Sequence, residues 1–176
     1  MSKLKINLTT KILLCVALPI VILVAFAILA LRATGNLMAE RMLEQRLAIS
    51  DHALKEMFNL TSTDAFSLEG DDLYLGSLNL TADNTIIDTY NKDTGIDVAI
   101  FYGTTRRATT VLASDGSRAV GTKLSEEAYQ QLKANGNFFS NNVVVEGEPY
   151  YAYYELIADY GSGNEVTVCT GISAQS

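Results

Sequence analysis

Two adjacent arginines stand at the start of a strand-like segment, beside side chains that suit a small-molecule site. Arg106 and Arg107 follow the aromatic pair Phe101 and Tyr102, and Thr109 comes three residues after the first arginine. An arginine offers a planar fork of N–H donors that matches a carboxylate. Aromatic walls with a few polar groups are typical of ligand pockets. We therefore expect a small organic ligand, carrying a carboxylate, near Arg106.

A later strand-like segment carries four tyrosines that could form the aromatic wall. Alternation along a strand puts Tyr151 and Tyr153 on one face and Tyr150 and Tyr154 on the other. Only one pair can therefore line a given pocket, and we expect Tyr151 and Tyr153 to line it together with Tyr102.

The competing interpretation of the same residues is structural. Arg106 could pair with a nearby acid such as Asp97 and hold the strand ends together, while the tyrosines pack the sheet. Tyrosine is common in strands for packing reasons alone.

The sequence shows none of the common catalytic motifs. It has no glycine-rich phosphate loop after a strand, no GxSxG elbow, no HExxH and no paired CxxC. Cys15 lies in an apolar run and Cys169 near the C-terminus, so we expect neither a disulfide nor a metal site. We predict a protein that is not an enzyme and uses no cofactor.

Charge is distributed unevenly along the chain. The first 32 residues contain four basic and no acidic side chains. Residues 33–176 carry nine basic and twenty acidic side chains, a formal net charge of −11. A domain this acidic repels phosphate backbones, so a nucleic-acid partner is not expected.

The N-terminal region contains an uncharged run, Ile12 to Leu31. Twenty helical residues reach about 30 Å, the thickness of the hydrocarbon core of a bilayer. We expect a transmembrane helix at 12–31. The alternatives are a cleaved signal peptide, whose apolar core is usually shorter, and a buried helix of a globular core.

The flanks of this run predict its orientation. Lys3, Lys5 and Lys11 precede it, while Arg32 alone follows closely. The positive-inside rule places residues 1–11 in the cytoplasm as a short stub. Residues 33–176 would then form a single extracytoplasmic domain at the cell membrane.

A long helix is expected from Ala33 to Leu60. Apolar residues recur there at helical spacing through Leu43, Leu47, Leu54 and Met57. This stripe could pack on the domain itself, or it could contact a second copy in a coiled-coil-like homodimer.

The rest of the chain predicts an α+β domain built on a central antiparallel sheet. The expected elements, in chain order, are a loop at 61–81 with a short strand at 73–75, a helix at 82–92, strands at 97–102 and 107–113 with a return at 118–121, a helix at 126–134 after the capping residue Ser125, a hairpin of 142–146 with 149–157, and a last strand at 165–171.

Several segments together resemble the single Cache domain of bacterial methyl-accepting chemotaxis proteins. They are LYLGSLNLT at 73–81, TGIDVAIFYG at 94–103, TRRAT at 105–109, DGSRAVGT at 115–122 and PYYAYY at 149–154. The resemblance covers nearly the whole chain. It implies a PAS-like sheet with a long N-terminal helix, and a domain that senses small molecules outside the cell.

The resemblance also implies site residues. Related dicarboxylate and citrate sensor kinases use an arginine and a polar residue three places later, which match Arg106 and Thr109. Their polar residue is often histidine, and a further basic residue on a later strand has no counterpart near Ala152. Because of these two differences, the resemblance does not extend to the class of ligand.

The resemblance further implies the input module of a chemotaxis transducer. The alternatives are the input module of a membrane sensor kinase or cyclase, and an anchored solute-binding protein without signalling output. A complete chemoreceptor would continue into a second span, a HAMP relay and a coiled coil. Since the sequence ends at Ser176, we expect a truncated product, a fragment or a stand-alone decoy or partner subunit.

Overall fold

The computed structural model describes residues 7–158 and 164–175, and the chain divides into two compact units, Met1–Met42 and Leu43–Ser176. Helix α1 (Leu8–Thr61) contributes to both. Within the described residues it is the one helix long and apolar enough to cross a membrane, and its apolar stretch is not buried. A signal sequence would have the same properties, whereas the core helix of a globular protein would be buried.

The second unit contains a five-stranded antiparallel sheet with the strand order β5-β4-β8-β7-β6. Its elements are α2 (Thr85–Thr94), β4 (Asp97–Tyr102), β5 (Thr105–Thr109), α3 (Glu126–Asn135), β6 (Asn137–Val145), β7 (Glu148–Ala158) and β8 (Val166–Ser173). The predicted α+β fold class is confirmed.

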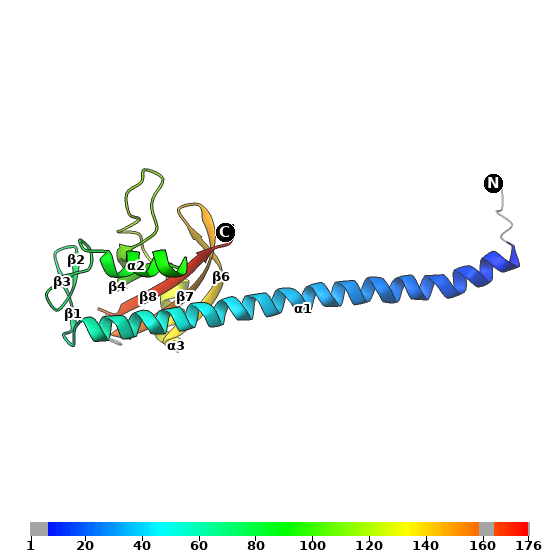
Figure 1. Cartoon of the computed structure of the whole chain (residues 1–176), viewed down its shortest axis with the longest axis horizontal. Helices are drawn as coiled ribbons and strands as arrows, with labels where there is room; N and C mark the ends of the chain where they lie inside the picture. The colour runs from blue at the N-terminus through cyan, green and yellow to red at the C-terminus, as the bar shows by residue number, and fades with distance from the viewer. Residues whose placement is uncertain (1–6, 159–163, 176) are drawn as a thin grey trace. The chain divides into compact units, whose positions relative to one another are not determined.

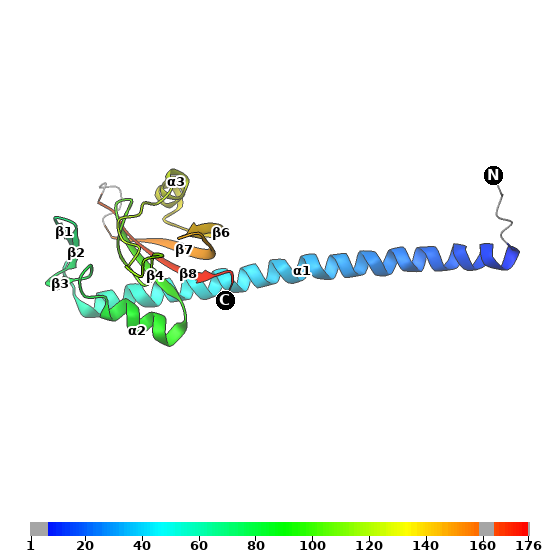
Figure 2. The same ribbon diagram turned by 90° about the horizontal axis from the view of Figure 1, so that it is seen from above.

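Helices α1 and α2 lie on one face of this sheet and α3 lies on the other (Figures 1 and 2), and a hydrophobic cluster packs on each face. The first joins Leu54 and Phe58 of α1 and Ile87 of α2 to strand residues such as Ile100. The second joins Leu132 of α3 to strand residues that include Phe101, Ala152 and Tyr154. We call these the α1 face and the α3 face.

Helix α3 begins and ends where its sequence predicts. The Ser125 side chain accepts a hydrogen bond from the backbone N–H of Ala128 at 3.2 Å, and Glu126 and Glu127 occupy the first turn. Both features stabilise a helix N-terminus. Gly136 ends the helix with a left-handed φ of 78°, which glycine adopts without steric cost.

The segment 61–81 differs from the prediction of a loop with one strand. It forms a small three-stranded sheet of β1 (Phe66–Glu69), β2 (Asp72–Leu75) and β3 (Leu78–Asn79). The predicted strand at 73–75 is confirmed as β2, whereas β1 and β3 are too short for alternation to reveal them in the sequence. The expected return strand at 118–121 is instead a single bridge, between Leu112 and Arg118.

Candidate ligand-binding site

A cavity of about 360 Å³ opens between the α3 face of the sheet and α3 itself. This volume lies within the range that holds small organic ligands. Its lining comes from β4, β5, α3, β6, β7 and the segment before α3, and consists of Phe101, Arg106, Lys123, Leu124, Ser125, Glu127, Ala128, Gln131, Phe138, Ser140, Asn142, Val143, Val144, Val145 and Tyr154.

A second, small space of about 20 Å³, which we call the extension, adjoins this cavity. The two spaces share Arg106, Val143 and Tyr154 among their walls. Asp97 and Tyr150 also line the extension, which is otherwise mostly apolar. The side chain of Arg106 therefore borders both spaces.

Arg106 is held at this position without an acidic partner. Its guanidinium carbon lies 5.3 Å from the centroid of the Phe101 ring, and Nη1 makes a long hydrogen bond of 3.4 Å to the carbonyl of Ala119. Its buried Nε has no partner, and no carboxylate of the described residues forms an ion pair with it. Arg107, by contrast, places Nη1 2.7 Å from Oδ1 of Asp71.

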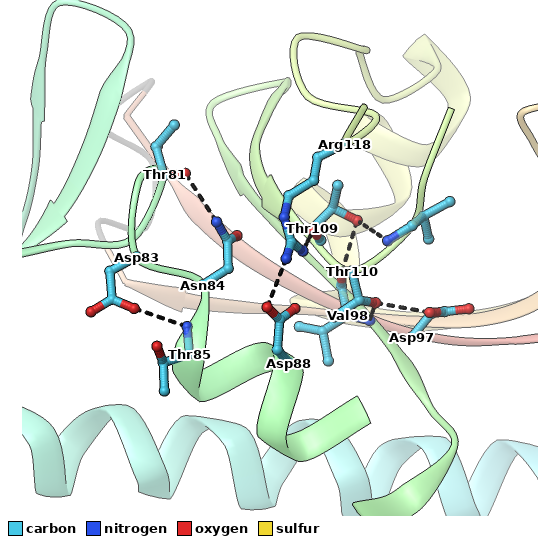
Figure 3. Close-up of polar contacts among 11 residues, drawn as sticks. Thr81, Asp83, Asn84, Thr85, Asp88, Asp97, Val98, Thr109, Thr110 and Arg118 are labelled. Atoms are coloured by element: carbon cyan, nitrogen blue, oxygen red, sulfur yellow. Dashed lines mark hydrogen bonds and ion pairs between the residues drawn. The ribbon is translucent and has the colours of Figure 1, made fainter. Parts of the chain in front are cut away.

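Asp97, the acid considered as a structural partner for Arg106, is engaged elsewhere. It accepts hydrogen bonds from the hydroxyls of Thr110 at 2.8 Å and Tyr150 at 3.0 Å, and from the side-chain amide of Asn91 at 3.1 Å (Figure 3 shows the Thr110 bond). Burial, and then the nearby charge of Asp97, raise the pKa of Tyr150 to about 12.

Thr109 lies on the same face of the sheet as Arg106, although a regular strand would put residues three apart on opposite faces. A β-bulge explains this, because Phe101 pairs with Arg106 while Ile100 pairs with Ala108. The Thr109 hydroxyl is buried, donates to the carbonyl of Val98 at 2.9 Å and accepts from the N–H of Val111 at 3.1 Å (Figure 3). Its hydrogen bonds are thus made to the strand backbone.

The structure puts all three tyrosines that were expected to line the pocket on the α1 face of the sheet. Tyr102 packs against the cluster of the α1 face, and Tyr153 pairs with Thr170, whose hydroxyl donates to the backbone of α1. By alternation Tyr151 shares the face of Tyr153. None of these three tyrosines shares a face with Arg106.

The other tyrosine pair lines the spaces around Arg106. Tyr150 borders the extension, and Tyr154 borders both spaces. The Tyr154 ring stacks on Phe138 with centroids 4.8 Å apart and an angle of 10° between planes. Burial, and then the neighbouring Cys169, raise the pKa of the Tyr154 hydroxyl, so it stays protonated well above neutral pH.

Small residues on neighbouring strands are the sequence signal that could have selected this pair. Ala152 lies between the two tyrosines on the same strand, and Gly171 pairs with it on β8. A Cβ at Gly171 would lie 3.3 Å from Cδ1 of Tyr150, so only glycine leaves the ring its present place. The sequence holds no comparable signal for the lining residues of α3 and β6, because tertiary packing brings them to the cavity.

The described residues offer no group of three or more His, Cys, Asp or Glu that could hold a metal ion. Cys169 lines the extension, and burial raises the pKa of its thiol to about 12, so it is protonated and unreactive at neutral pH. The site is therefore suited to binding through hydrogen bonds, charge and aromatic contact.

Comparison with known proteins supplies one match. The model of the family described as single cache domain 3 matches residues 78–175, which include Arg106, both cavity-lining tyrosines and all five strands of the main sheet. The comparison with curated proteins gives no match. The matched segment is more than half of the chain, and it is the part that forms the sheet and the cavity. The chain therefore belongs to the single Cache domain family, and its folded part is a ligand-sensing input module.

Proposed function

We propose that the chain is the ligand-binding input module of a membrane chemotaxis transducer and that it senses a small organic carboxylate at Arg106. The observation that carries this proposal is the state of Arg106. Its guanidinium lines a cavity of about 360 Å³ with no carboxylate of the described residues bound to it. A half-buried cation without an acid is a ready partner for an anionic ligand.

The surroundings of the guanidinium favour an anion of modest size. Lys123 also lines the cavity, as does the N-terminal turn of α3 with Ser125 and Ala128, and a helix N-terminus attracts negative charge. Glu127 faces the same cavity and would repel a ligand of high negative charge.

The roles within the proposed site follow from these positions. Arg106 binds the carboxylate, and Tyr154 supplies an aromatic wall. Thr109 acts indirectly, by fixing the strand that carries the arginine. Tyr102, Tyr151 and Tyr153 lie on the α1 face, where they would transmit a change in the sheet to α1 and not contact the ligand.

Thermal melts of the full chain in detergent micelles test the site. A panel of acetate, pyruvate, succinate and citrate would be compared with the corresponding uncharged amides. A ligand that binds only the native state raises the melting temperature. We expect at least one carboxylate, and not its amide, to do so.

Two neighbouring arginines provide the matched variants. Arg106→Ala should remove the shift caused by the carboxylate, because a charge-assisted hydrogen bond of about 1.5–3 kcal/mol corresponds to a roughly ten- to hundredfold loss of affinity. Arg107→Ala should keep the shift, since its ion pair with the 94 % exposed Asp71 side chain is a local surface contact. A shift that survives Arg106→Ala, or a protein stabilised only by neutral or cationic compounds, would contradict the proposal.

The membrane arrangement is part of the same proposal. Residues 1–11 would be cytoplasmic, 12–31 would span the membrane and 33–176 would lie outside, as the lysines before the span favour. Protease added to intact cells should digest the domain and spare the N-terminal stub. Protection of the whole chain, or release of a shortened soluble form, would contradict this arrangement.

The gene sequence after the codon for Ser176 would show which output domain the module serves. A second span and a Glu/Gln-rich heptad array would support the chemotaxis transducer. A kinase or cyclase domain would support the second candidate, and an immediate stop codon would support an anchored binding protein.

A further inference from the structure

A carboxyl group lies fully buried on the side of α1 that packs on the sheet. Asp51 is 0 % exposed and sits among Leu47, Leu54 and Phe58, which are buried on the same side of the helix. Neither of its oxygens has a hydrogen-bond partner among the described residues. Burying an ionised carboxylate in this way is costly, and apolar packing does not require it.

The charges nearest to Asp51 do not neutralise it. Lys55 lies one helical turn further along α1, and its ammonium forms an ion pair with Glu155 of β7 at 3.2 Å. Two carboxylates therefore face one ammonium across the contact between α1 and β7. Thr170 of β8 is also adjacent, but its hydroxyl donates to the carbonyl of Leu47 at 3.0 Å.

The other titratable groups near this contact do not pair with Asp51. Burial raises the pKa values of Tyr153 on β7 and of Cys169 on β8, so both are neutral at physiological pH. Tyr90 of α2 donates its hydroxyl hydrogen to the backbone of α1 at 3.3 Å. The guanidinium of Arg46 on α1 donates to the carbonyl of Thr94 at 3.0 Å.

We propose that Asp51 is a proton-binding site, and that the proton is a second ligand of this protein, acting on the packing of α1 against the sheet. With Asp51 protonated, the Lys55–Glu155 ion pair is balanced and the carboxyl group is a neutral side chain in an apolar contact. With Asp51 ionised, its charge is buried and repelled by Glu155, and Thr170 and Lys55 offset this cost only in part. Water entry or displacement of α1 relieves that cost.

The direction of the effect follows from the pKa of Asp51. Burial raises it well above the ordinary value of 3.8, the charge of Glu155 raises it further, and Thr170 and Lys55 lower it by less. The packed state thus holds a proton that the unfolded chain releases. This contribution to stability is complete below pH 3.8 and is lost as the pH rises through the pKa of packed Asp51.

In signalling terms, acid favours the packed arrangement of α1 and base favours its release. A ligand shifts an equilibrium only by binding its two states unequally, and the proton does so here. The site lies on the α1 face, so the carboxylate cavity on the α3 face is not required for this response. The response of the protein to pH is therefore independent of the ligand proposed for Arg106.

The test uses the full chain in lipid nanodiscs with ¹³C-carboxyl-labelled aspartate. Asp51→Asn identifies the Asp51 resonance by its loss, and we expect that resonance to titrate well above pH 3.8. In thermal melts the parent should lose stability relative to Asp51→Asn as the pH rises through the same midpoint. Amides of residues 47–58 should then exchange faster in the parent than in the variant at equal pH.

Two further variants make the result specific. Asp93→Asn removes an aspartate at the exposed end of α2 and should leave the Asp51 titration and the pH slope of the parent unchanged. Glu155→Gln removes the repelling charge and should move the Asp51 midpoint to lower pH, a result that remains measurable if Asp51→Asn does not fold. An Asp51 resonance that titrates near pH 3.8, equal pH slopes for parent and Asp51→Asn, or a midpoint unmoved by Glu155→Gln would overturn the proposal.

Discussion

The guanidinium of Arg106 lies over the ring of Phe101, its registered partner on the neighbouring strand, at 5.3 Å from the ring centroid. The face of an aromatic ring is negative and attracts a cation. The arginine is thus positioned by an uncharged side chain, which leaves donors of its guanidinium free for an anion. An aspartate at the same place would have consumed them.

This contact predicts an energetic coupling between the two residues. A double-mutant cycle with Phe101→Leu and Arg106→Ala, measured by urea denaturation, should give a coupling free energy of about 0.5–2 kcal/mol. The matching cycle with Phe66→Leu should be additive within roughly 0.5 kcal/mol, because Phe66 packs on the α1 face. A Phe101 cycle that is equally additive would show that the ring does not hold the arginine.

Tyr150 predicts a loss of stability in alkali. Its pKa is raised to about 12, so the folded protein keeps a phenolic proton that an unfolded tyrosine releases near 10. The stabilisation by Tyr150 is complete below pH 10 and is lost as the pH rises towards 12. The difference in unfolding free energy between the parent and Tyr150→Phe should therefore shrink across this range in urea denaturation.

A variant at Thr110 separates titration from the loss of a hydrogen bond. Thr110→Val removes another donor to the same Asp97 carboxylate but no titrating proton. The unfolding free energy of Thr110→Val should stay below that of the parent by a constant amount across the alkaline range. If the unfolding free energy of Tyr150→Phe also stayed below that of the parent by a constant amount, the proposed titration of Tyr150 would be contradicted.

Leu54 predicts how strongly α1 is held to the sheet. Its side chain is 0 % exposed in the core of the α1 face, and Leu54→Ala should lower the unfolding free energy by about 2–5 kcal/mol. Leu60→Ala removes the same atoms from a side chain that is 86 % exposed, and should change it by less than about 0.5 kcal/mol. Similar costs for both variants, by urea denaturation, would contradict this packing.

The proposed homodimer can be tested along α1. The stripe residues Leu47 and Leu54 are buried within the domain, whereas Ile49 is 70 % exposed. In a background with Cys15 and Cys169 replaced by alanine, Ile49→Cys should crosslink between copies in membranes and Leu47→Cys should not. Absence of crosslinks at Ile49 and at Met42, with a monomer by sedimentation, would show that the stripe serves only the domain.

Much of the fold could be predicted because its signals are local. Ser125 and Gly136 mark the ends of α3, Gly95 ends α2, and alternation marks β4 and β7. Of the small sheet only β2 could be predicted, as the strand at 73–75, whereas β1 and β3 left no readable pattern of their own. Residues 137–141, which extend β6 beyond the predicted hairpin, are held by pairing with β7 and not by their own pattern.

The site could be predicted only in part, for a physical reason. Strand alternation tells which tyrosines share a face, but which face meets which helix depends on packing between distant segments. The sequence singles out Arg106 as one of two adjacent arginines in an acidic domain, and it does line the cavity, while its role in binding a ligand stays a prediction. The bulge that brings Thr109 to the same face is a property of the β4–β5 pairing, and the sequence alone does not separate the buried Asp51 from the other polar residues of α1.

The position of β8 has a kinetic consequence. This strand comes last in the main sheet by sequence, yet it lies between β4 and β7, so that Asp97 pairs with Gly171. A hairpin of β6 and β7 can form early, but β4 is paired along only one edge, with β5, until β8 has been added. Such non-local pairing slows folding. In a protein exported through a membrane, the sheet would close only after translocation of β8, and the unsatisfied edge of β4 is where a folding chaperone or an aggregation partner would bind first.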